Sequence, residues 1–272
     1  MNETTYRLLA TDESAPITVH NADGRSPFLI VVDHAGNAIP RSLDGLGICE
    51  TECERHIAWD IGIAAVSRLV ADALDATLVQ QNYSRLVIDC NRPPGSETSI
   101  PETSELTSIP GNINLSEAWR AARLHEIFQP YHDRISIELD RRRRAGRPAV
   151  LIAMHSFTPV YMGVARPWQC SMLYNRDPRF ARVLMALLNR EEGILVGDNE
   201  PYSVTDAMDY TIPVHGERRD LLHVEIEIRQ DLIADDIGQR MWGARLARLL
   251  PEAYQTLAAA SVPIKRSAPE RS

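Results

Sequence analysis

Two histidines directly follow short apolar runs of the sequence, a position where chemistry concentrates in α/β proteins. His34 comes after residues 28–33 (FLIVVD), and His155 comes after residues 149–154 (AVLIAM). Ligands of open α/β sheets bind beyond the carboxyl ends of the strands, so both histidines can lie at one edge. Imidazole nitrogens suit Zn²⁺, and a catalytic zinc site uses three protein ligands and one water position. A lone histidine there is more often structural, but two favour a metal site.

A third metal ligand could come from the segment HIAWDIG, residues 56–62. His56 and Asp60 are four positions apart, which places both on one face of a helix that we expect over residues 56–74. Asp60 has apolar neighbours, among which an unpaired carboxylate is costly. An ordinary contact within the helix explains the spacing equally well, so both interpretations stay open.

Side chains suited to binding a substrate carboxylate follow another apolar run. Asn91 and Arg92 come directly after residues 85–89 (RLVID). The guanidinium group is planar and always charged, and it can bind a carboxylate through two parallel hydrogen bonds. A structural ion pair of Arg92 with Asp89 or another acid is the alternative interpretation.

A general base could lie in residues 222–228 (LHVEIEI), where apolar and polar residues alternate. The period of two is that of a strand, and it places Glu225 and Glu227 on the same face. Either carboxylate could take a proton from water and deliver it to a departing amine. Spacing cannot separate the two glutamates, and both could instead pair with Arg229.

Together these residue types predict metal-assisted hydrolysis of an amide in an acidic substrate. A bound metal lowers the pKa of water and polarises a carbonyl, a carboxylate moves the proton, and a guanidinium holds the substrate. The motifs of competing chemistries are absent: G-x-S-x-G, the Walker A loop, G-x-G-x-x-G and H-E-x-x-H.

The elements that must position these residues alternate between strands and helices, which indicates an α/β fold. The expected strands are residues 28–33, 76–80, 85–89, 149–154, 193–197 and 222–228, and the expected helices are residues 56–74, 116–144, 178–190 and 235–260. Ser116 is a candidate N-cap, and Pro130 should kink or divide its helix. Residues 93–112, rich in Pro, Ser and Thr, should form a long loop.

We expect a single-domain, three-layer α/β sandwich over residues 1–265, with a mostly parallel or mixed central sheet and a disordered tail over residues 266–272. The length of 272 residues, 44% hydrophobic and 24% charged, is ordinary for a soluble globular protein. The net charge of −8 argues against general nucleic-acid binding. Four cysteines without a CxxC pair, no secretory signal and no apolar run long enough for a membrane span favour a cytoplasmic protein, with a homo-oligomer left open.

Five segments in order give the chain a resemblance to a known family. They are DHAGNAIP (33–40), HIAWDIG (56–62), YSRLVIDCNRP (83–93), MHSFTP (154–159) and EIRQDL (227–232). The set resembles the N-formylglutamate amidohydrolase family, which is remotely similar to zinc carboxypeptidases and aspartoacylases and implies a phosphorylase/hydrolase-like α/β fold. No single segment is specific, but their order over residues 28–235 is.

The resemblance implies a role for each candidate residue. His34 and His155 become ligands of one divalent ion, with Zn²⁺ expected, and Glu227 becomes the catalytic base ahead of Glu225. Those relatives carry a glutamate three residues after the first histidine, where this chain has Asn37. A neutral amide is a poor zinc ligand, so Asp60 is the expected third ligand, with Asn37 and His56 as alternatives. The substrate-binding residues by the same resemblance are Asn91, Arg92 and Arg85.

The activity that the resemblance implies is hydrolysis of N-formyl-L-glutamate to formate and L-glutamate, a reaction of histidine degradation. A related zinc deacylase or carboxypeptidase-like hydrolase with another substrate is the first alternative. A metal-free binding protein on the same scaffold is the second, and the metal content of purified protein would separate it from an enzyme.

Overall fold

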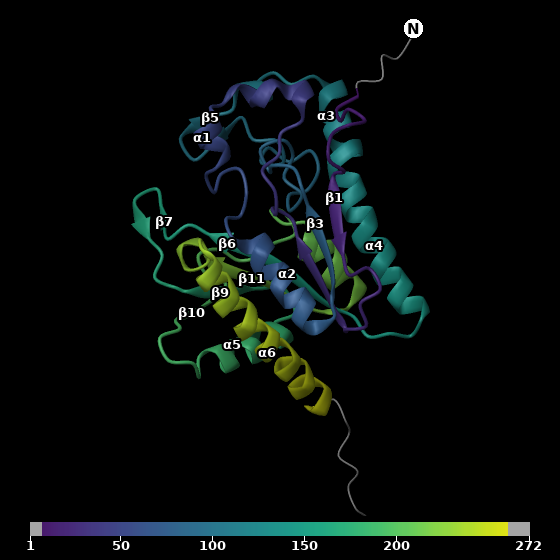
Figure 1. Cartoon of the computed structure of the whole chain (residues 1–272), viewed down its shortest axis with the longest axis vertical. Helices are drawn as coiled ribbons and strands as arrows, with labels where there is room; N and C mark the ends of the chain where they lie inside the picture. The colour runs from purple at the N-terminus through teal and green to yellow at the C-terminus, as the bar shows by residue number, and fades with distance from the viewer. Residues whose placement is uncertain (1–6, 261–272) are drawn as a thin grey trace, which may run out of the picture.

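A seven-stranded mixed sheet forms the middle of the molecule in the computed structural model, which describes residues 7–260 (Figure 1). The strand order is β1-β3-β2-β6-β11-β9-β10. The strands are β1 Ile17–His20, β2 Phe28–Val32, β3 Thr77–Gln81, β6 Val150–Phe157, β9 Cys170–Leu173, β10 Val196–Asp198 and β11 Leu222–Arg229. The four central strands β3, β2, β6 and β11 run parallel, whereas β1 pairs antiparallel with β3 and β9 pairs antiparallel with β11. The expected tail, residues 266–272, lies outside the described residues.

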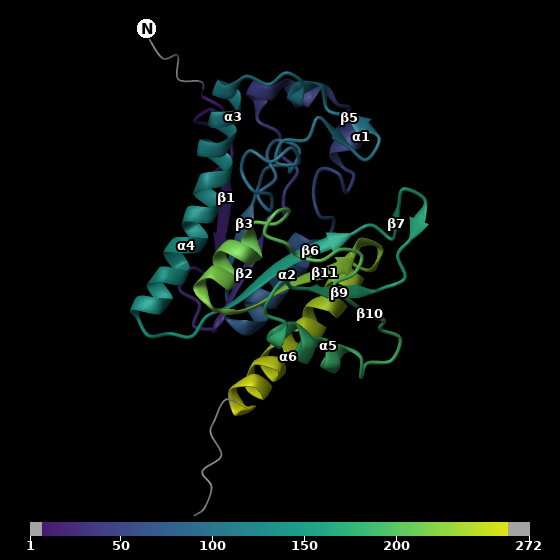
Figure 2. The ribbon, with the colours of Figure 1, turned by 180° about the vertical axis from the view of Figure 1, so that it is seen from behind.

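Helices cover both faces of this sheet, which makes a three-layer sandwich (Figures 1 and 2). One face is packed by α2 Ile63–Leu74, α5 Arg179–Leu188 and α6 Asp236–Ala260. The other face is packed by α3 Glu117–Arg123, a π-helical segment Leu124–Phe128 and α4 Gln129–Arg144. Short elements complete the chain: α1 Glu50–Cys53, the hairpin of β4 Thr103–Ser104 and β5 Thr107–Ser108, and the hairpin of β7 Val160–Tyr161 and β8 Val164–Ala165.

Two apolar cores, one on each face, follow from the alternation of side chains along the strands. In β2, Phe28, Ile30 and Val32 belong to the core under α2, α5 and α6, while Leu29 and Val31 belong to the core under α3 and α4. A strand that is buried on both faces reads as a continuous apolar run. Full burial of one such side chain stabilises the fold by about 1.5–3 kcal/mol, so the strands that carry the site are held firmly.

The sequence predicted this fold class and five of the seven strands of the main sheet, but not strands β1 and β9. The strands expected over residues 28–33, 76–80, 149–154, 193–197 and 222–228, and the helices expected over residues 178–190 and 235–260, all have counterparts in the structure. The helical stretch 116–144 is divided at a π-helical segment just before Pro130, and Ser116 accepts a hydrogen bond from the Trp119 amide (3.4 Å) as its N-cap. Within residues 7–260, no helix is long and apolar enough to cross a membrane.

Two expected elements are wrong. Residues 85–89 form no strand: they lie in a turn, closed by the hydrogen bond from the Val87 amide to the Ser84 carbonyl (2.9 Å). Their apolar side chains are buried in the core under α3 and α4 without being part of the sheet. Residues 56–62 form no helix either, because α2 begins only at Ile63. His155 lies inside β6, two residues before its end, instead of after it.

Candidate active site

Three segments bring His34, Asp60 and His155 together at the carboxyl edge of the sheet. His34 follows β2, His155 lies near the end of the neighbouring β6, and Asp60 comes from the loop that precedes α2. The Asp60 amide donates a hydrogen bond to the His34 carbonyl (2.9 Å), which ties the loop to the strand end. All three side chains are buried. Asp60 thus reaches the site from a loop, although the sequence predicted a helix through residues 56–62.

The loop that carries Asp60 depends on a glycine. Gly62 has a φ of +81°, a conformation that L side chains rarely adopt, and a Cβ added there would lie 2.1 Å from the Ile233 carbonyl oxygen. The chain therefore turns sharply between Asp60 and α2 against a neighbouring backbone. This turn explains why the periodic pattern of α2 does not extend back to His56.

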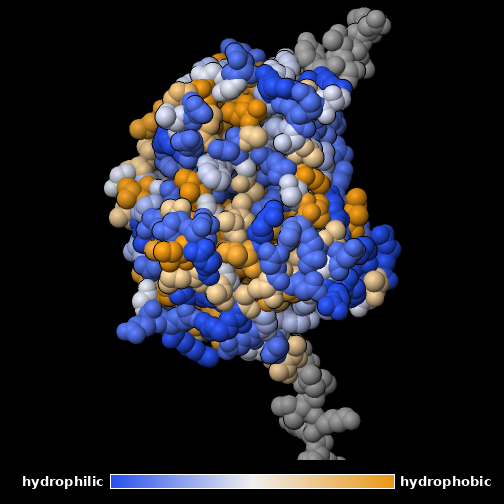
Figure 3. All heavy atoms as spheres, in the orientation of Figure 1, coloured by the Kyte–Doolittle hydropathy of each residue, from blue (hydrophilic) through white to orange (hydrophobic). Residues whose placement is uncertain are grey.

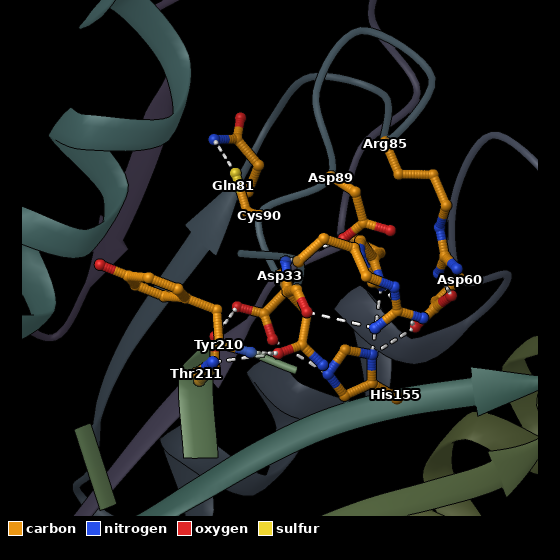
Figure 4. A network of polar contacts seen from close by, with 12 residues as sticks. Asp33, Asp60, Gln81, Arg85, Asp89, Cys90, His155, Tyr210 and Thr211 are labelled. Atoms are coloured by element: carbon orange, nitrogen blue, oxygen red, sulfur yellow. Dashed lines mark hydrogen bonds and ion pairs between the residues drawn. The ribbon is translucent and has the colours of Figure 1, made fainter. Parts of the chain in front are cut away.

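Three possible ligand atoms converge at the centre of this group, and Figure 4 labels two of the residues that carry them, Asp60 and His155. The Nδ1 atoms of His34 and His155 lie 3.2 Å apart, and Asp60 Oδ2 lies 2.9 Å from His155 Nδ1 and 3.6 Å from His34 Nδ1. Two imidazoles and one carboxylate are the ligand types of a catalytic zinc site, which uses three protein ligands.

The outer nitrogens of both imidazoles face carboxylates. His34 Nε2 lies 2.7 Å from Asp89 Oδ1, and His155 Nε2 lies 3.0 Å from Asp33 Oδ2. A carboxylate at that position takes the ring N–H and fixes the tautomer, as it does beside metal-bound histidines. When both rings are neutral with their protons on Nε2, both Nδ1 atoms present lone pairs towards Asp60, and this donor set fits a divalent cation. Without a cation, a second proton on His155 takes that place: burial lowers the pKa of His155, but the carboxylates of Glu225, Asp33 and Asp60 outweigh it and raise that pKa well above its ordinary value.

The carboxylates around the imidazoles are ionised although they are buried. Burial raises the pKa of the Asp33 carboxyl, but the hydrogen bond and charge of His155 outweigh it and leave that pKa at about 2. For Asp60, burial is outweighed by the charges of Arg85 and His34, which hold its pKa well below the usual value. The pKa of Asp89 is lowered for the same kind of reason, with burial opposed by the charges of His34 and Arg92. The site therefore carries several negative charges that suit a cation.

The two alternatives for the third ligand point elsewhere. The Asn37 side chain donates a hydrogen bond to the Cys53 carbonyl (3.0 Å). His56 Nε2 lies 3.0 Å from a Glu105 oxygen. Neither belongs to the group of His34, Asp60 and His155, which is the set of possible ligands that the described residues bring together.

Glu225 and Glu227 both reach this site from β11, on the face opposite to Val224, Ile226 and Ile228. Glu227 is the direct neighbour of His155 across the parallel pair of β11 and β6. One Glu227 oxygen accepts a hydrogen bond from the Tyr202 hydroxyl, and the other, Oε2, is buried without a hydrogen-bond partner among the described residues. Neither glutamate pairs with Arg229, which binds Asp231 instead (2.8 Å).

Burial shapes the protonation of both glutamates. Burial raises the pKa of Glu225 to about 8 against the charge of His155, and the charges of Asp209 and Glu227 add to the rise. Burial also raises the pKa of Glu227, against the charge of His155. Glu225 Oε2 lies 3.4 Å from the Asn91 amide nitrogen, so its contacts differ from those of Glu227.

The candidate substrate-binding residues differ in how many of their hydrogen-bonding atoms are already bound within the fold. Arg85 forms an ion pair with Asp60, and its Nε is buried without a hydrogen-bond partner within the described range. Arg92 donates to the Met208 carbonyl (2.9 Å) and to Asp209 (3.2 Å). Asn91 is occupied in the fold, because its side-chain oxygen accepts hydrogen bonds from two backbone amides of the loop before residue 212. Arg85 thus has the clearest unused donor.

Two adjoining cavities open onto these residues. The inner one, of about 30 Å³, is lined by the two histidines, Asp60, both glutamates and both arginines. The outer one is a chamber of about 720 Å³. The two share Asp60, Arg85, Arg92, Ser156 and Tyr202. A substrate in the chamber can therefore reach the convergent ligand atoms.

Several site residues were not predicted from the sequence. Tyr202 and Asp209 come from the irregular segment 199–211, which has no periodic signal. Thr211 donates a hydrogen bond to Asp33 (2.7 Å), which holds the carboxylate against His155. Asp33 and Asp89 stand within the quoted motifs, yet their contacts with the imidazoles depend on segments that meet only in the fold.

Comparisons with known proteins identify one family. The family model described as N-formylglutamate amidohydrolase matches residues 26–234. An N-formylglutamate deformylase of Pseudomonas putida is 32% identical over 144 residues, which are 49% of this chain and 52% of that protein. The chain thus spans about half the length of the curated relatives that it matches.

Solved structures extend the similarity to nearly the whole chain. A gene product from Agrobacterium tumefaciens matches with a TM-score of 0.90 and 38% identity, over 93% of this chain and 100% of the other. An N-formylglutamate amidohydrolase from Ralstonia eutropha matches with a TM-score of 0.66 and 19% identity, over 90% and 100% of the two chains. The second match supports the fold alone.

Proposed function

Since the chain belongs to the N-formylglutamate amidohydrolase family, we propose that it hydrolyses the acyl amide of N-acylated acidic amino acids, with N-formyl-L-glutamate giving formate and L-glutamate. The observation that carries this proposal is the convergence of two Nδ1 atoms and one carboxylate oxygen beside a buried glutamate. Such a set is suited to metal-assisted hydrolysis, because a catalytic zinc site uses three protein ligands and a nearby carboxylate to move the proton.

One divalent ion, with Zn²⁺ as our choice, would be held by His34, Asp60 and His155. When bound, such an ion supplies Lewis-acid chemistry, because it polarises a carbonyl group and lowers the pKa of water. Asp33 and Asp89 would hold both imidazoles in the tautomer that presents Nδ1, since each accepts the proton of an Nε2 atom.

Glu227 would move the protons of the reaction. Glu227 lines the inner cavity and its Oε2 atom lacks a partner within the described residues, so it can accept the proton of the attacking water. The same oxygen can then deliver that proton to the nitrogen of the departing amino acid. Tyr202 holds the other oxygen and keeps the carboxylate oriented. Glu225 also lines the inner cavity, but its Oε2 lies 3.4 Å from the Asn91 side-chain nitrogen and Tyr202 holds Glu227 instead.

Arginines would hold the carboxylate of the substrate. Arg85 and Arg92 line both cavities, and the Nε of Arg85 has no hydrogen-bond partner within the described residues. Arg92 would act with part of its guanidinium, because the remainder binds Met208 and Asp209. Asn91 would contribute by fixing the loop beside Arg92.

The exchange of Glu227 for Gln tests this proposal. We expect kcat for N-formyl-L-glutamate in the presence of Zn²⁺ to fall by roughly 10²–10⁴-fold, the usual contribution of a positioned acid–base group. Metal content and KM should change little, since neither the ligands nor the arginines are touched. The matched control is Glu225→Gln, which removes a neighbouring charge on the same strand face and should lower kcat much less.

The reverse order of the two variants would identify Glu225 as the base. If wild-type protein with added Zn²⁺ cleaves no N-acyl amino acid, the proposed function is wrong, and a metal-free binding protein on this scaffold becomes the better explanation.

A further inference from the structure

The outer chamber is much larger than N-formylglutamate requires. Its volume is about 720 Å³. N-formylglutamate has about twelve non-hydrogen atoms, and at the roughly 30 Å³ that a molecule of liquid water occupies these would fill at most about 360 Å³. Chambers of this size commonly enclose drug-sized ligands. About half of the space is therefore left for a further group.

Much of the wall of this extra space is apolar. The apolar side chains that line it include Phe157, Tyr161, Met162, Val164, Trp168 and Met208, while His56, Thr103 and Glu105 line another part of the chamber. Several of the apolar side chains come from the hairpin of β7 and β8, whose strands Val160–Tyr161 and Val164–Ala165 are exposed. Exposed contiguous apolar surface often marks a ligand groove.

The hairpin of β7 and β8 has a regular turn, and its apolar side chains lie at the rim of the chamber. Met162 and Gly163 have φ angles of +49° and +81°, as in the two-residue turns that match the twist of β-hairpins. Val164 is 68% exposed and Met162 is 55% exposed, yet both line the chamber. Apolar spheres appear at the left edge of Figure 3, where Figure 1 labels β7. These side chains contribute little to either core and are placed to contact an occupant.

The charged residues of the chamber also differ between its floor and the hairpin. The floor carries Asp60, Arg85, Asp89 and Arg92, all in contact with the candidate metal site or its supports. At the hairpin, Arg166 forms no ion pair with a carboxylate of the described residues, and its guanidinium lies 4.8 Å from the Tyr161 ring centre and 5.8 Å from that of Phe157. An arginine stacked on two rings extends a flat surface suited to an aromatic group.

We infer that the preferred substrates are amphipathic N-acyl amino acids, which carry a carboxylate for the charged floor and an apolar or aromatic group of about benzyl size for the hairpin wall. This inference rests on the proposed amide hydrolysis and extends its substrate class beyond N-acylated acidic amino acids. The apolar group sits on the acyl side or on the amino-acid side of the scissile amide, and both arrangements place it in the same chamber.

A panel of substrates assayed with added Zn²⁺ tests the inference. The panel contains N-formyl-L-glutamate, N-phenylacetyl-L-glutamate and N-formyl-L-phenylalanine. We expect kcat/KM for at least one extended substrate to exceed that for N-formyl-L-glutamate by tenfold or more, since a well-filled apolar pocket discriminates by at least that factor. Cleavage of N-formyl-L-glutamate in preference to both extended substrates overturns the inference and leaves the proposed function intact. Cleavage of no substrate overturns both.

A variant of the hairpin locates the effect. Val164→Glu places a charge on the apolar wall and should lower kcat/KM for the extended substrate at least tenfold more than for N-formyl-L-glutamate. The matched control is Ile237→Glu on α6, because Ile237 is 65% exposed and lies outside the chamber lining. It should keep the wild-type ratio between the two substrates. Equal ratios in both variants would overturn the assignment of the wall.

Discussion

Two pairs of buried histidines lie in this molecule, and the comparison between them explains why only one pair suits a metal. In the first, the Nδ1 atoms of His34 and His155 are 3.2 Å apart. In the second, His132 Nδ1 on α4 is 2.9 Å from His215 Nε2, in the π-helical segment Ile212–Gly216. All four imidazoles are buried. Proximity and burial therefore do not distinguish the pairs.

The partners of the outer nitrogens make the difference. His132 Nε2 lies 2.8 Å from the Cys90 carbonyl, to which it donates, so its Nδ1 is an acceptor for a proton on His215 Nε2. Two neutral rings satisfy this arrangement without a cation. In the first pair, the outer nitrogens face the carboxylates of Asp89 and Asp33, and the surrounding carboxylates favour a positive charge between the rings. A carboxylate behind each ring thus makes a histidine pair suited to a cation.

The first prediction concerns the loss of either histidine of the first pair. His34→Ala or His155→Ala should lower the metal content from about one ion per chain to nearly none, because two donors cannot replace a three-ligand site. Amidohydrolase activity should fall below about one thousandth of wild type for lack of the ion. Metal analysis of folded, purified protein is the measurement.

The matched control for these variants is His132→Ala. It removes an equally buried imidazole from the second pair and should lower stability through the cavity that it leaves, while metal content stays at the wild-type level. Full metal occupancy in either His34→Ala or His155→Ala would refute the site.

The second prediction sharpens the comparison at the outer nitrogens. Asp89→Asn and Asp33→Asn keep the shape of the side chain and remove the charge behind one imidazole. Each should weaken Zn²⁺ affinity by about 10–100-fold, the usual effect of such supporting partners. Competition with a chromogenic chelator measures this. Asp209→Asn is the control, since Asp209 lines the inner cavity but binds Arg92 and the Thr205 amide. Equal loss in all three variants would show a general charge effect.

The third prediction concerns the stability that the second pair contributes as pH changes. Burial lowers the pKa of His132 to about 4, against the charge of Asp33. Burial also lowers the pKa of His215 to about 3, and the charges of His132 and Arg219 add to the decrease. An unfolded histidine takes up its proton near pH 6.5, so acidification from about 6.5 to 4 favours the unfolded chain. Each histidine should lower the free energy of unfolding by up to about 1.4 kcal/mol per pH unit in this range.

Urea unfolding of metal-free protein at pH 7.5, 6 and 5 measures this dependence. His215→Asn removes one of the two titrating rings and should flatten the pH dependence relative to wild type. An unchanged slope in the variant would mean that the second pair already carries a proton in the folded protein.

The sequence was most informative where burial is regular. Strands β2 and β6 are buried on both faces and appear as apolar runs, and α5 and α6 show helical periodicity. Residues 85–89 have the same apolar character for another reason, since they are buried in a turn against α3 and α4. A short apolar run cannot by itself distinguish a buried strand from a buried loop.

For the candidate site, residue types were more predictable than local structure. Asp60 was singled out within a helix that does not form, and the structure brings it to both histidines from a loop fixed by Gly62. The roles of Glu227 and Arg92 stay predictions. The contacts of Tyr202 and Asp209 could not be foreseen, because they depend on an irregular segment whose path is set by tertiary packing.

The strand order has a consequence for how this protein folds. His34 and His155 are 121 positions apart, yet they meet because β2 pairs directly with β6. Such non-local pairing makes folding slow, since the entropy of closing long loops must be overcome before the contacts form. No local segment of the chain contains all three candidate ligands, so a divalent ion should bind only after the central sheet has assembled. Added metal would then slow unfolding by mass action on the native state and leave the rate of refolding unchanged.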